Sequence, residues 1–347
     1  PPVDQSAMDG YALGSNSING LYNVIGEIKA GDSAEQYILK DGEAIRIFTG
    51  AMVPDSAFSV AKQEIVERSD NQIRLSNSTS KGENIRAAGE QIEKGQLVIQ
   101  KGRKLSPGAT GYLATLGISE IEVYRKPKIK IIATGNELVL PGDTLESGKI
   151  FESNTTTVQS ALQYYGFNSE ISIVEDDYNE ILKIINDSIN NYDLIIVTGG
   201  ISVGDYDYVS SVFKELEVEQ CFYKVKQKPG KPLYFGKKNN TILFGLPGNP
   251  AAALTCVYLY VLEVIRFMSG GMEPFLSEQE LTLTSEYVKS AGLTHILKAQ
   301  AIGSNVKILN AQSSAMLSSF IDSNCLVLCD ENETVFKAGS TVKVKRF

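Results

Sequence analysis

The segment DLIIVTGGISVGDYDY, residues 193–208, carries the pattern that decides the fold. Its first residues form a short apolar run, which is typical of a buried strand in a parallel sheet. Three glycines and two aspartates follow the run, and the next segment, DYVSSVFKEL, is predicted to be a helix. Ligands of an open α/β sheet bind outside the carboxyl ends of the strands, where glycines let backbone N–H groups approach an anion closely. We therefore predict an anion-binding turn here, unless the glycines only turn the chain and the aspartates only cap the helix.

The alternation of strand and helix extends to both sides of this segment. Strands are predicted at KIKIIAT, SEISIV and DLIIVT, and helices at NTTTVQSALQYYG, NEILKIINDSINN and DYVSSVFKEL. Asn154 is expected to cap the first helix and Gly166 to end it. A hairpin turning at Asn239–Asn240 and a long apolar helix from Pro250 follow. This pattern predicts a parallel sheet with helices on both faces, in an α/β domain over residues 127–270.

The flanking regions are predicted to be rich in β-strands. Short strand-like runs dominate the first 126 residues, apart from a helix in SPGATGYLATLGI that Ser106 can cap. Strand-like runs return after the segment GGMEP and predict a small C-terminal domain that resembles a β-barrel. The expected fold is therefore multidomain, α/β plus all-β. The predicted domains are a linking domain (1–20 and 96–126), a β-rich domain (21–95), the α/β domain (127–270) and a C-terminal β domain (271–347). Because the chain begins at Pro1 without a methionine, we expect the rest of the linking domain to precede it.

Composition and charge argue against several classes of function. The chain has 347 residues, and its formal net charge of −8 argues against nucleic-acid binding. The apolar run AAALTCVYLYVLEVIRFM contains Glu263 and Arg266 and is therefore predicted to be a buried helix rather than a membrane span. A single histidine, His295, argues against zinc catalysis and a Ser-His-Asp triad. Four cysteines without a disulfide pattern favour a reducing cytoplasm, although Cys325 and Cys329 share one face of a predicted strand.

Three predicted loops follow strands of the α/β domain at the same edge of the sheet. These loops are ATGNELVLPGD, VEDDYNE and TGGISVGDYDY, and among the carboxylates that they supply are Glu137, Asp176, Asp177, Asp205 and Asp207. Carboxylates beside a phosphate-binding turn favour Mg²⁺, which proteins bind partly through substrate oxygens. The sequence therefore predicts a site for a phosphate-bearing ligand and Mg²⁺ at this edge.

A cluster of lysines follows in the segment YKVKQKPGKP. Lys224, Lys226, Lys228 and Lys231 lie within eight residues of a net-acidic chain. Strand alternation predicts one common face for the first three. Like charges this close repel one another unless water or a bound anion screens them. The cluster therefore favours an anion site, unless it only protects a solvated edge strand from aggregation.

Two further segments carry candidate residues. GLPGNPAAA predicts a helix N-terminus with Asn249 as the cap, which either binds an anion or only connects a strand to a helix. DQSAMDGYA has no helix or strand period, and its acidic residues are Asp4 and Asp9. This segment is either a well-determined exposed loop or a frayed terminus.

Taken in order, these segments resemble a known family. PPVDQSAMDGYA, IFTGAMVP, TGNEL followed by PG, TGGISVGDYDY, KPGKP, GLPGNP and SSAMLSSFIDSNC are similar to the molybdopterin molybdenumtransferases, which include the C-terminal domain of gephyrin. The resemblance implies an enzyme that uses Mg²⁺ to insert molybdenum from molybdate into adenylylated molybdopterin, with release of AMP. It also implies a cytoplasmic homodimer with an active cleft shared between subunits, and a molybdopterin adenylyltransferase as its pathway partner, with no nucleic acid or membrane involved. The alternatives are a scaffold that binds molybdopterin without turnover, and a molybdopterin adenylyltransferase that shares the α/β domain.

The resemblance also implies which residues form the site. The family's catalytic residues correspond to Asp9, Glu137, Asp176, Asp207, Lys224 and Lys228, among which Glu137, Asp176 and Asp207 would bind the metal. The expected cofactor-binding residues are Thr49, Gly199, Gly200, Ser202, Gly204, Lys231, Pro247, Pro250, Lys298 and Ser314. Two positions depart from the family, since Gln91 replaces an acidic residue and Lys298 replaces an arginine. Glutamine lacks the negative charge, and lysine lacks the bidentate fork of arginine, so a lower or redirected activity is an open alternative.

Overall fold

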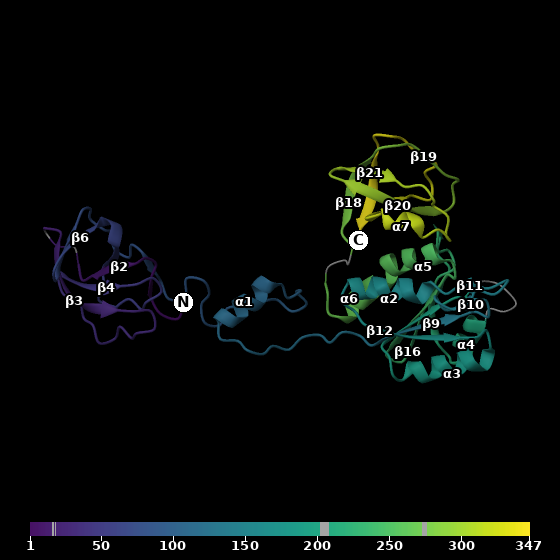
Figure 1. The fold of residues 1–347 in the computed structure, drawn as a ribbon, viewed down its shortest axis with the longest axis horizontal. Coiled ribbons are helices and arrows are strands. Elements are labelled where there is room, and N and C mark those ends of the chain that lie inside the picture. The colour runs from purple at the N-terminus through teal and green to yellow at the C-terminus, as the bar shows by residue number, and fades with distance from the viewer. Residues whose placement is uncertain (16, 18, 202–207, 273–275) are drawn as a thin grey trace. The chain divides into compact units, whose positions relative to one another are not determined.

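A computed structural model describes residues 1–347 with the exception of residues 16, 18, 202–207 and 273–275. The chain divides into two compact units, Pro1–Gln100 and Lys101–Phe347, each with hydrophobic cores of its own. Figure 1 labels helices and strands of both units where there is room. The finer division into four domains stays a prediction.

The first unit is built on a sheet whose described strands have the order β5–β2–β4–β3–β7–β6. The elements are β1 (Gln5–Ser6), β2 (Gly10–Leu13), β3 (Leu21–Ile28), β4 (Glu43–Ile47), β5 (Ser59–Lys62), a 3₁₀ turn (Gln63–Ile65), β6 (Val66–Ser69), β7 (Gln72–Leu75) and β8 (Ile85–Arg86). Side chains of β2 alternate between two cores, since Ala12 packs in one while Tyr11 and Leu13 pack in the other. Both faces of this central strand are therefore buried.

The second unit contains the predicted α/β domain. Its described sheet has the order β12–β9–β13–β17–β16–β14, in which β12, β9, β13 and β17 are parallel. The elements from its start are α1 (Pro107–Thr115), β9 (Ile129–Thr134), β10 (Leu138–Val139), β11 (Ile150–Phe151), α2 (Asn154–Tyr164), β12 (Ser169–Val174), α3 (Tyr178–Ile189), β13 (Leu194–Thr198), α4 (Tyr208–Glu215), β14 (Glu219–Tyr223), β15 (Gln227–Lys228), β16 (Tyr234–Lys238) and β17 (Thr241–Leu246). The predicted alternation of strands and helices is confirmed, as is the hairpin at Asn239–Asn240.

Two hydrophobic cores lie on the two faces of this sheet. Neighbouring residues of β9 divide between them, because Ile131 packs with α2 on one face and Ile132 packs with α3 and α4 on the other. The long apolar helix also covers the first face. It consists of α5 (Pro250–Cys256), a π-helical segment (Val257–Val261) and α6 (Leu262–Met268). Among the described residues, Pro250–Met268 is the one helix that is long and apolar enough to cross a membrane by length and composition alone. Because 56% of its apolar 18-residue window is buried, it fits the predicted core helix.

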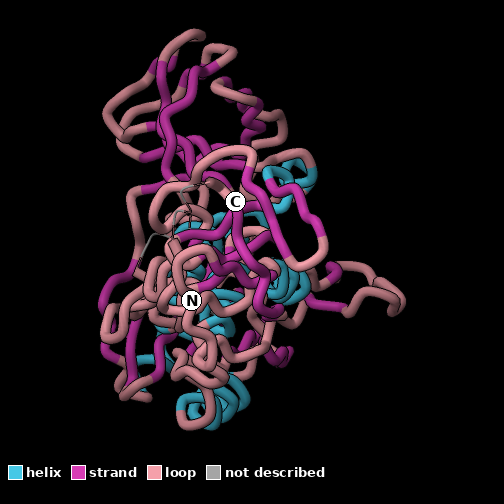
Figure 2. The backbone as a smooth tube through the Cα atoms, turned by 90° about the vertical axis from the view of Figure 1, so that its left-hand side faces the viewer, coloured by secondary structure: helices cyan, strands magenta, loops and turns pink. Residues whose placement is uncertain are grey.

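A closed β-barrel forms the C-terminal part of the second unit, as predicted. The strands β20–β21–β18–β24–β22 form a ring that closes between β22 and β20, and β15 of the α/β domain extends it at β20. The elements are β18 (Glu278–Leu283), β19 (Tyr287–Val288), β20 (Thr294–Ile302), β21 (Asn305–Ile308), α7 (Ser318–Ile321), β22 (Cys325–Cys329), β23 (Val335–Phe336) and β24 (Thr341–Arg346). The upper part of Figure 2 shows the barrel as strands and loops. Cys325 and Cys329 both face its core, so their predicted common face is confirmed.

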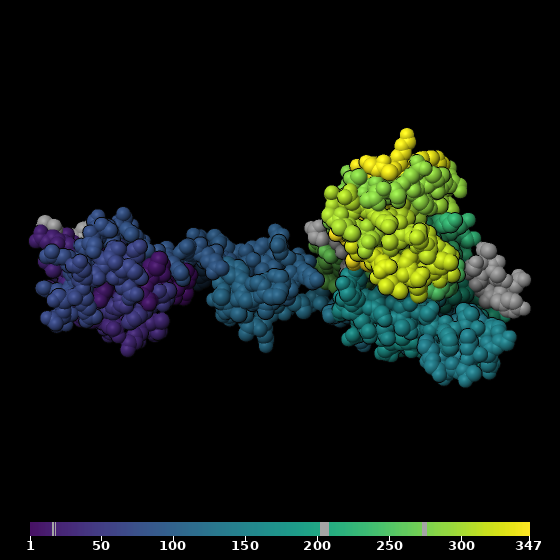
Figure 3. All heavy atoms as spheres, turned by 45° about the horizontal axis from the view of Figure 1, so that its top comes forward, coloured from purple at the N-terminus to yellow at the C-terminus, as the bar shows by residue number. Residues whose placement is uncertain are grey.

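The barrel packs directly on the α/β domain, as the space-filling view shows (Figure 3). Phe320 of α7 lies against the core beneath the long helix. The ring of Tyr258, which comes from the π-helical segment, stacks on the ring of Phe347 with centroids 4.1 Å apart. The long helix is therefore shared between the two domains of this unit.

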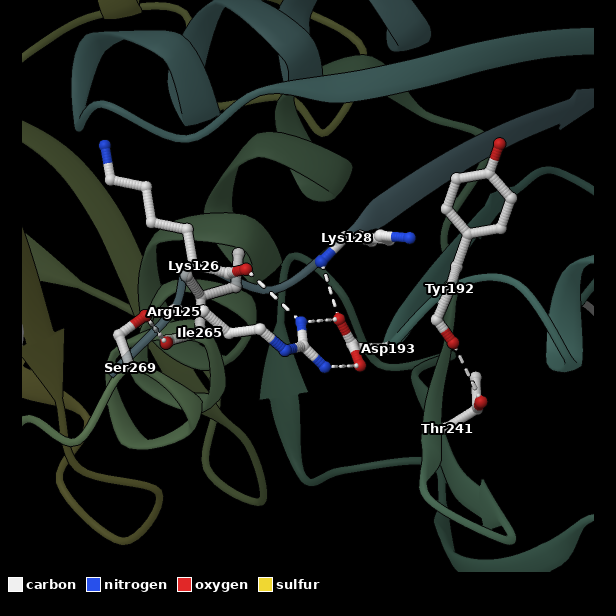
Figure 4. Close-up of polar contacts among 8 residues, drawn as sticks. All are labelled: Arg125, Lys126, Lys128, Tyr192, Asp193, Thr241, Ile265 and Ser269. Atoms are coloured by element: carbon white, nitrogen blue, oxygen red, sulfur yellow. Dashed lines mark hydrogen bonds and ion pairs between the residues drawn. The ribbon is translucent and has the colours of Figure 1, made fainter. Parts of the chain in front are cut away.

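An ion pair lies at the amino ends of β9 and β13 (Figure 4). Asp193, directly before β13, binds the guanidinium of Arg125 through both carboxylate oxygens, at 2.5 and 2.6 Å, and accepts a hydrogen bond from the backbone N–H of Lys128. These bonds hold the pKa of Asp193 below its usual range. Thr241 is the first residue of β17, the neighbouring strand. Its hydroxyl contacts the carbonyl oxygens of Ile189 and Tyr192 at 2.7 and 2.8 Å, which connects the start of β17 to the end of α3 and the segment after it.

One predicted helix cap differs from the structure and another is confirmed. Asn154 was expected to cap α2, but it is the first helical residue, and Ser153 precedes it as the N-cap residue. The cap is supplied by Glu152, whose carboxylate accepts hydrogen bonds from the N–H and the hydroxyl of Thr155 at 2.8 and 2.5 Å. At α1, Ser106 accepts from the N–H of Ala109, as predicted. The carboxylate of Glu152, just before the helix, therefore acts as the cap that was expected of Asn154. The side chain of Asn154 instead binds outside its own helix.

Candidate functional site

The carboxyl ends of β9 and β13 form the centre of the candidate site. β12, the next strand of the parallel part of the sheet after β9 in the sequence, lies on one side of β9, and β13, the strand after that, lies on the other side. The order of the strands therefore reverses between β9 and β13. Each of these strands ends in a threonine, Thr134 or Thr198, whose exposed fractions are 4% and 1%. Neither hydroxyl has a hydrogen-bond partner among the described residues. Buried polar groups are rarely left without a partner, and this reversal point is where α/β sheets bind ligands, so the two hydroxyls indicate a ligand site.

The turn after β13 closes against Thr134. Gly199 and Gly200 have φ angles of +87° and +61°, which favour glycine. A Cβ atom on Gly199 would lie 2.7 Å from the carbonyl oxygen of Thr134, and one on Gly200 would lie 2.8 Å from Val209 Cγ2. Both glycines are therefore required by close packing as well as by backbone conformation. The predicted residues Ser202, Gly204, Asp205 and Asp207 lie outside the described residues.

The two loops after β9 and β12 are joined by a hydrogen bond. The side-chain oxygen of Asn136 accepts from the backbone N–H of Asp176 at 3.0 Å, which brings the loops of Glu137 and Asp176 together. Asp177 has a structural role, because its carboxylate caps α3 by accepting from the N–H groups of Asn179 and Glu180. In the part of the chain that the structure describes, no group of three acidic, histidine or cysteine ligands occurs. Mg²⁺ usually takes one or two carboxylates together with substrate oxygens, so Glu137 and Asp176 fit such an ion.

The GLPGNP loop meets the same centre. Gly248 lies against Gly199, with its Cβ position 3.8 Å from Gly199 Cα, and the predicted residue Pro247 is buried directly before it. The carbonyl oxygen of Gly248 accepts from Asn154 Nδ2 at 2.8 Å. Asn154 Oδ1 is buried and has no partner among the described atoms. Asn154 therefore adds a third unpartnered polar group beside the glycine turn.

The N-terminus of α5 receives a residue of the barrel. Asn249 is the N-cap residue by position, but its side chain makes no cap and instead donates from Nδ2 to Ser314 Oγ at 3.1 Å. The N–H of Ala252 donates to the carbonyl oxygen of Ser314, also at 3.1 Å. Pro250 has no N–H to offer. Ser314 thus occupies part of the helix terminus that the sequence suggested as an anion site.

The lysine cluster does not form one continuous strand face, so that expectation was wrong. β14 ends at Tyr223 and Lys224 has a φ of +68°, which interrupts the strand alternation. Lys226 pairs with Glu331 of the barrel at 3.8 Å. The exposed residues Lys228 and Lys231 flank a turn that abuts α5, because a Cβ atom on Gly230 there would lie 2.6 Å from Cys256 Sγ. Two of the predicted lysines are therefore placed on a turn that packs against α5.

Lys298 is buried and faces the protein backbone. Its exposed fraction is 2%, and its ammonium donates to the carbonyl oxygens of Ala311, Ser313 and Met316 at 2.8, 3.3 and 2.9 Å. Burial lowers the pKa of this ammonium. The N–H donors of Lys298 are therefore hydrogen-bonded to backbone carbonyl groups of the segment that carries Ser314.

In the first unit, Asp9 and Thr49 are in contact. Asp9 Oδ1 accepts from the backbone N–H and the hydroxyl of Thr49 at 2.7 and 2.8 Å, and these bonds hold the pKa of Asp9 below its usual range. Asp4 accepts from the N–H of Ala88 at 2.7 Å, so the segment is a well-determined loop and not a frayed terminus. Gln91 is exposed.

Three residues of this site with a buried, unpartnered polar atom were not predicted from the sequence as site residues, namely Thr134, Thr198 and Asn154. A signal for the threonines was present, since each stands between an apolar strand and a glycine, in ATG and VTGG. No comparable pattern marks Asn154, because its contact with Gly248 joins residues 94 positions apart.

Comparison with known proteins agrees with this architecture. Residues 1–117 match the MoeA N-terminal region (domain I and II), residues 130–266 match a probable molybdopterin binding domain, and residues 280–347 match the MoeA C-terminal region (domain IV). Molybdopterin molybdenumtransferases of Staphylococcus aureus (strain Mu50) and Staphylococcus epidermidis (strain RP62A) are each 32% identical, over 99% of this chain and 85% of their own length.

Solved structures show the same relationship. Two structures of molybdopterin biosynthesis MoeA proteins from Pyrococcus horikoshii superpose with TM-scores of 0.85 and 0.83, at 30% and 26% identity. Each comparison covers 100% of this chain and 88% of the other. The chain therefore belongs to the molybdopterin molybdenumtransferase (MoeA) family, and it is a transferase of molybdenum cofactor biosynthesis.

Proposed function

We propose that this protein inserts molybdenum from molybdate into adenylylated molybdopterin, with Mg²⁺, and releases AMP. The observation that carries the proposal is the pair of buried, unpartnered hydroxyls of Thr134 and Thr198 beside the Gly199–Gly200 turn. A phosphate or pterin group bound there would supply the hydrogen-bond partners that both hydroxyls lack. The family relationship supports the choice of molybdopterin as the group concerned.

The residues around this centre suit a phosphate-bearing substrate. The hydroxyls of Thr134 and Thr198 can donate to phosphate oxygens, and the N–H groups of the glycine turn can approach the same oxygens closely. Glu137 and Asp176, on their hydrogen-bonded loops, would hold Mg²⁺, which neutralises charge on the departing phosphate. Lys228 would attract the anionic substrate to the turn.

The molybdate end is proposed to lie where the barrel meets α5. Ser314, Asn249 and Pro250 come together there, and the turn with Lys228 and Lys231 packs against the same helix. Molybdate is a divalent oxyanion, which hydroxyl, amide and ammonium donors bind well. Asp9 and Thr49 belong to the first unit, and we propose that they contribute to a cleft shared between the subunits of a cytoplasmic homodimer. The substrate would come from a molybdopterin adenylyltransferase.

The test is a defined reaction with purified protein, adenylylated molybdopterin, MgCl₂ and sodium molybdate. We expect release of AMP together with molybdenum bound in the pterin product, and loss of both when EDTA removes the metal. AMP release and molybdenum incorporation no greater than in a protein-free control would refute the proposal. Tungstate in place of molybdate would measure how strictly the site selects its oxyanion.

A scaffold that binds molybdopterin without turnover is the second candidate, and Gln91 favours it. Gln91 is exposed and stands where the family resemblance implies an acidic residue. Its neutral amide cannot act as a base or neutralise the charge of a metal ion. In that case the protein would bind molybdopterin tightly in a filter-binding or fluorescence assay and release no AMP. ATP consumption would instead indicate an adenylyltransferase.

A further inference from the structure

Lys298 occupies an unusual environment for a lysine. It lies on β20 between Leu297 and Ala299, which face the barrel core, so its side chain points out of the barrel. The segment from 309 to 320 covers it and leaves 2% of the residue exposed. Its ammonium forms no ion pair within the described residues, and three carbonyl oxygens of that segment accept from it.

The same segment is also fixed to the backbone of Lys298. The side chain of Gln312 accepts from the N–H of Lys298 at 3.0 Å and donates to its carbonyl oxygen at 2.8 Å. Ala311, one residue earlier, has a φ of +59°, in the left-handed region that strains a residue other than glycine. Its carbonyl oxygen accepts from Lys298 Nζ and from Ser319 Oγ, so two donors hold this strained residue in place.

The fixed segment delivers Ser314 to the N-terminus of α5. Ser314 Oγ accepts from Asn249 Nδ2, and its carbonyl oxygen accepts from the N–H of Ala252. Ser313, whose carbonyl oxygen binds Lys298, directly precedes Ser314. Two consecutive residues therefore connect Lys298 to α5: Ser313 is hydrogen-bonded to Lys298, and Ser314 is hydrogen-bonded to the N-terminus of α5.

An ammonium has three N–H donors, and in this chain all three are engaged by carbonyl oxygens. Lys298 cannot bind an oxyanion without giving up one of these bonds. An arginine, which the family resemblance implies at this position, carries five donors and would keep some free for a ligand. We propose that Lys298 is a positioning residue: it fixes residues 311–316 so that Ser314 is held on the N-terminus of α5. The inference rests on the proposed function of this end of the cleft as the molybdate end.

The structure offers a matched control in Lys289. It is also buried in the barrel, with an exposed fraction of 7%, and its ammonium donates to carbonyl oxygens of Leu293, Glu331 and Ser290 at 3.0, 3.3 and 3.5 Å. Lys289→Met should therefore remove a comparable lysine from the same barrel without touching residues 311–316. The variants to compare with it are Lys298→Met, Lys298→Arg and Gln312→Ala.

The first measurement is hydrogen exchange of the Ala252 amide, whose partner is the carbonyl oxygen of Ser314. We expect Lys298→Met to raise this exchange at least tenfold, Lys298→Arg to restore most of the protection, and Lys289→Met to leave it within twofold of wild type. Unchanged exchange in Lys298→Met would overturn the inference. This measurement needs no substrate, so it decides the question even if the protein proves inactive and the proposed function fails.

The second measurement is the KM for molybdate in the insertion assay. Gln312→Ala removes the two hydrogen bonds between the Gln312 side chain and the Lys298 backbone but leaves the ammonium of Lys298 in place. If Lys298 positions Ser314, this variant should have a KM for molybdate at least fivefold higher. If Lys298 binds the anion directly, its KM should not change. If Lys298→Met proves unfolded, Gln312→Ala carries both measurements. A double variant Lys298→Met/Ser314→Ala should be no worse than the more impaired single variant, because both act through Ser314. Effects that multiply in the double variant, or a Gln312→Ala enzyme with normal exchange and KM, would overturn the inference.

Discussion

Replacing the buried hydroxyl of Thr198 with a methyl group should separate stability from binding. Valine has nearly the same shape and suits a central strand, so Thr198→Val changes little except the hydroxyl. Because this hydroxyl has no partner among the described residues, its removal should leave the free energy of unfolding unchanged or raise it by about 1–2 kcal/mol.

Thr241 provides the comparison within the same sheet. It is similarly buried, at 4% exposed, but its hydroxyl contacts two carbonyl oxygens at 2.7 and 2.8 Å. Thr241→Val leaves both acceptors in a buried environment without that donor, which should lower the free energy of unfolding by about 1–3 kcal/mol. The two substitutions are chemically identical, yet the structure predicts shifts of opposite sign or of clearly different size.

Binding should respond in the reverse order. A hydrogen bond from Thr198 to a charged phosphate is worth about 1.5–3 kcal/mol, so Thr198→Val should weaken binding of adenylylated molybdopterin about ten- to a hundredfold. Thr241 lies at the amino end of β17, away from the proposed site, and its variant should bind normally when folded. Urea unfolding gives the stabilities and equilibrium titration gives the affinities. The reasoning is refuted if Thr198→Val destabilises the protein as much as Thr241→Val, or if it binds the substrate as tightly as wild type.

Three other perturbations test the site and its frame. Lys228→Ala should weaken binding of adenylylated molybdopterin about ten- to a hundredfold in an equilibrium titration, because one charge-assisted contact is worth about 1.5–3 kcal/mol. Lys237→Ala, on the exposed end of β16, should leave this binding unchanged, and equal effects of the two substitutions would remove Lys228 from the site. The ion pair of Asp193 with Arg125 depresses the aspartate pKa, so its contribution to stability is complete above the usual aspartate pKa and is lost as pH falls through the lowered value. Asp193→Asn should therefore lower the urea midpoint at pH 7 and flatten its decline in acid, and an unchanged acid profile would contradict this assignment. Gln91→Asp restores an acidic group at an exposed position, so AMP release should rise while the melting temperature shifts little, and an unaltered rate would remove residue 91 from the reaction.

The α/β domain could be predicted from sequence because its signals are local. Apolar strands such as DLIIVT alternate with amphipathic helices, and each element shows its period within a dozen residues. The helix cap at Ser106 also depends only on a residue three positions away. The barrel was expected for the same reason, from short strands that follow one another closely.

The details of the site depend on contacts that sequence spacing does not contain. Strand alternation correctly places Lys298 outside the barrel core, but only the folded segment 309–320 shows that the residue is buried. The lysine cluster failed as a strand face because Lys224 adopts a positive φ, which nothing in YKVKQKPGKP signals. Asn154 was expected to cap α2, but Glu152 takes that role through a hydrogen bond that sequence reasoning had no reason to prefer.

The long helix connects the two proposed binding regions, which lie in different domains of the second unit. Its N-terminus, at Asn249, touches both the glycine turn, through Gly248, and the barrel, through Ser314. Its π-helical segment carries Tyr258, which stacks on Phe347 at the end of the barrel. The helix therefore contacts the barrel at two places, through Asn249 and through Tyr258. A shift of the barrel would therefore change the position of Ser314 relative to the threonine hydroxyls, and with it the spacing of the proposed phosphate and oxyanion regions.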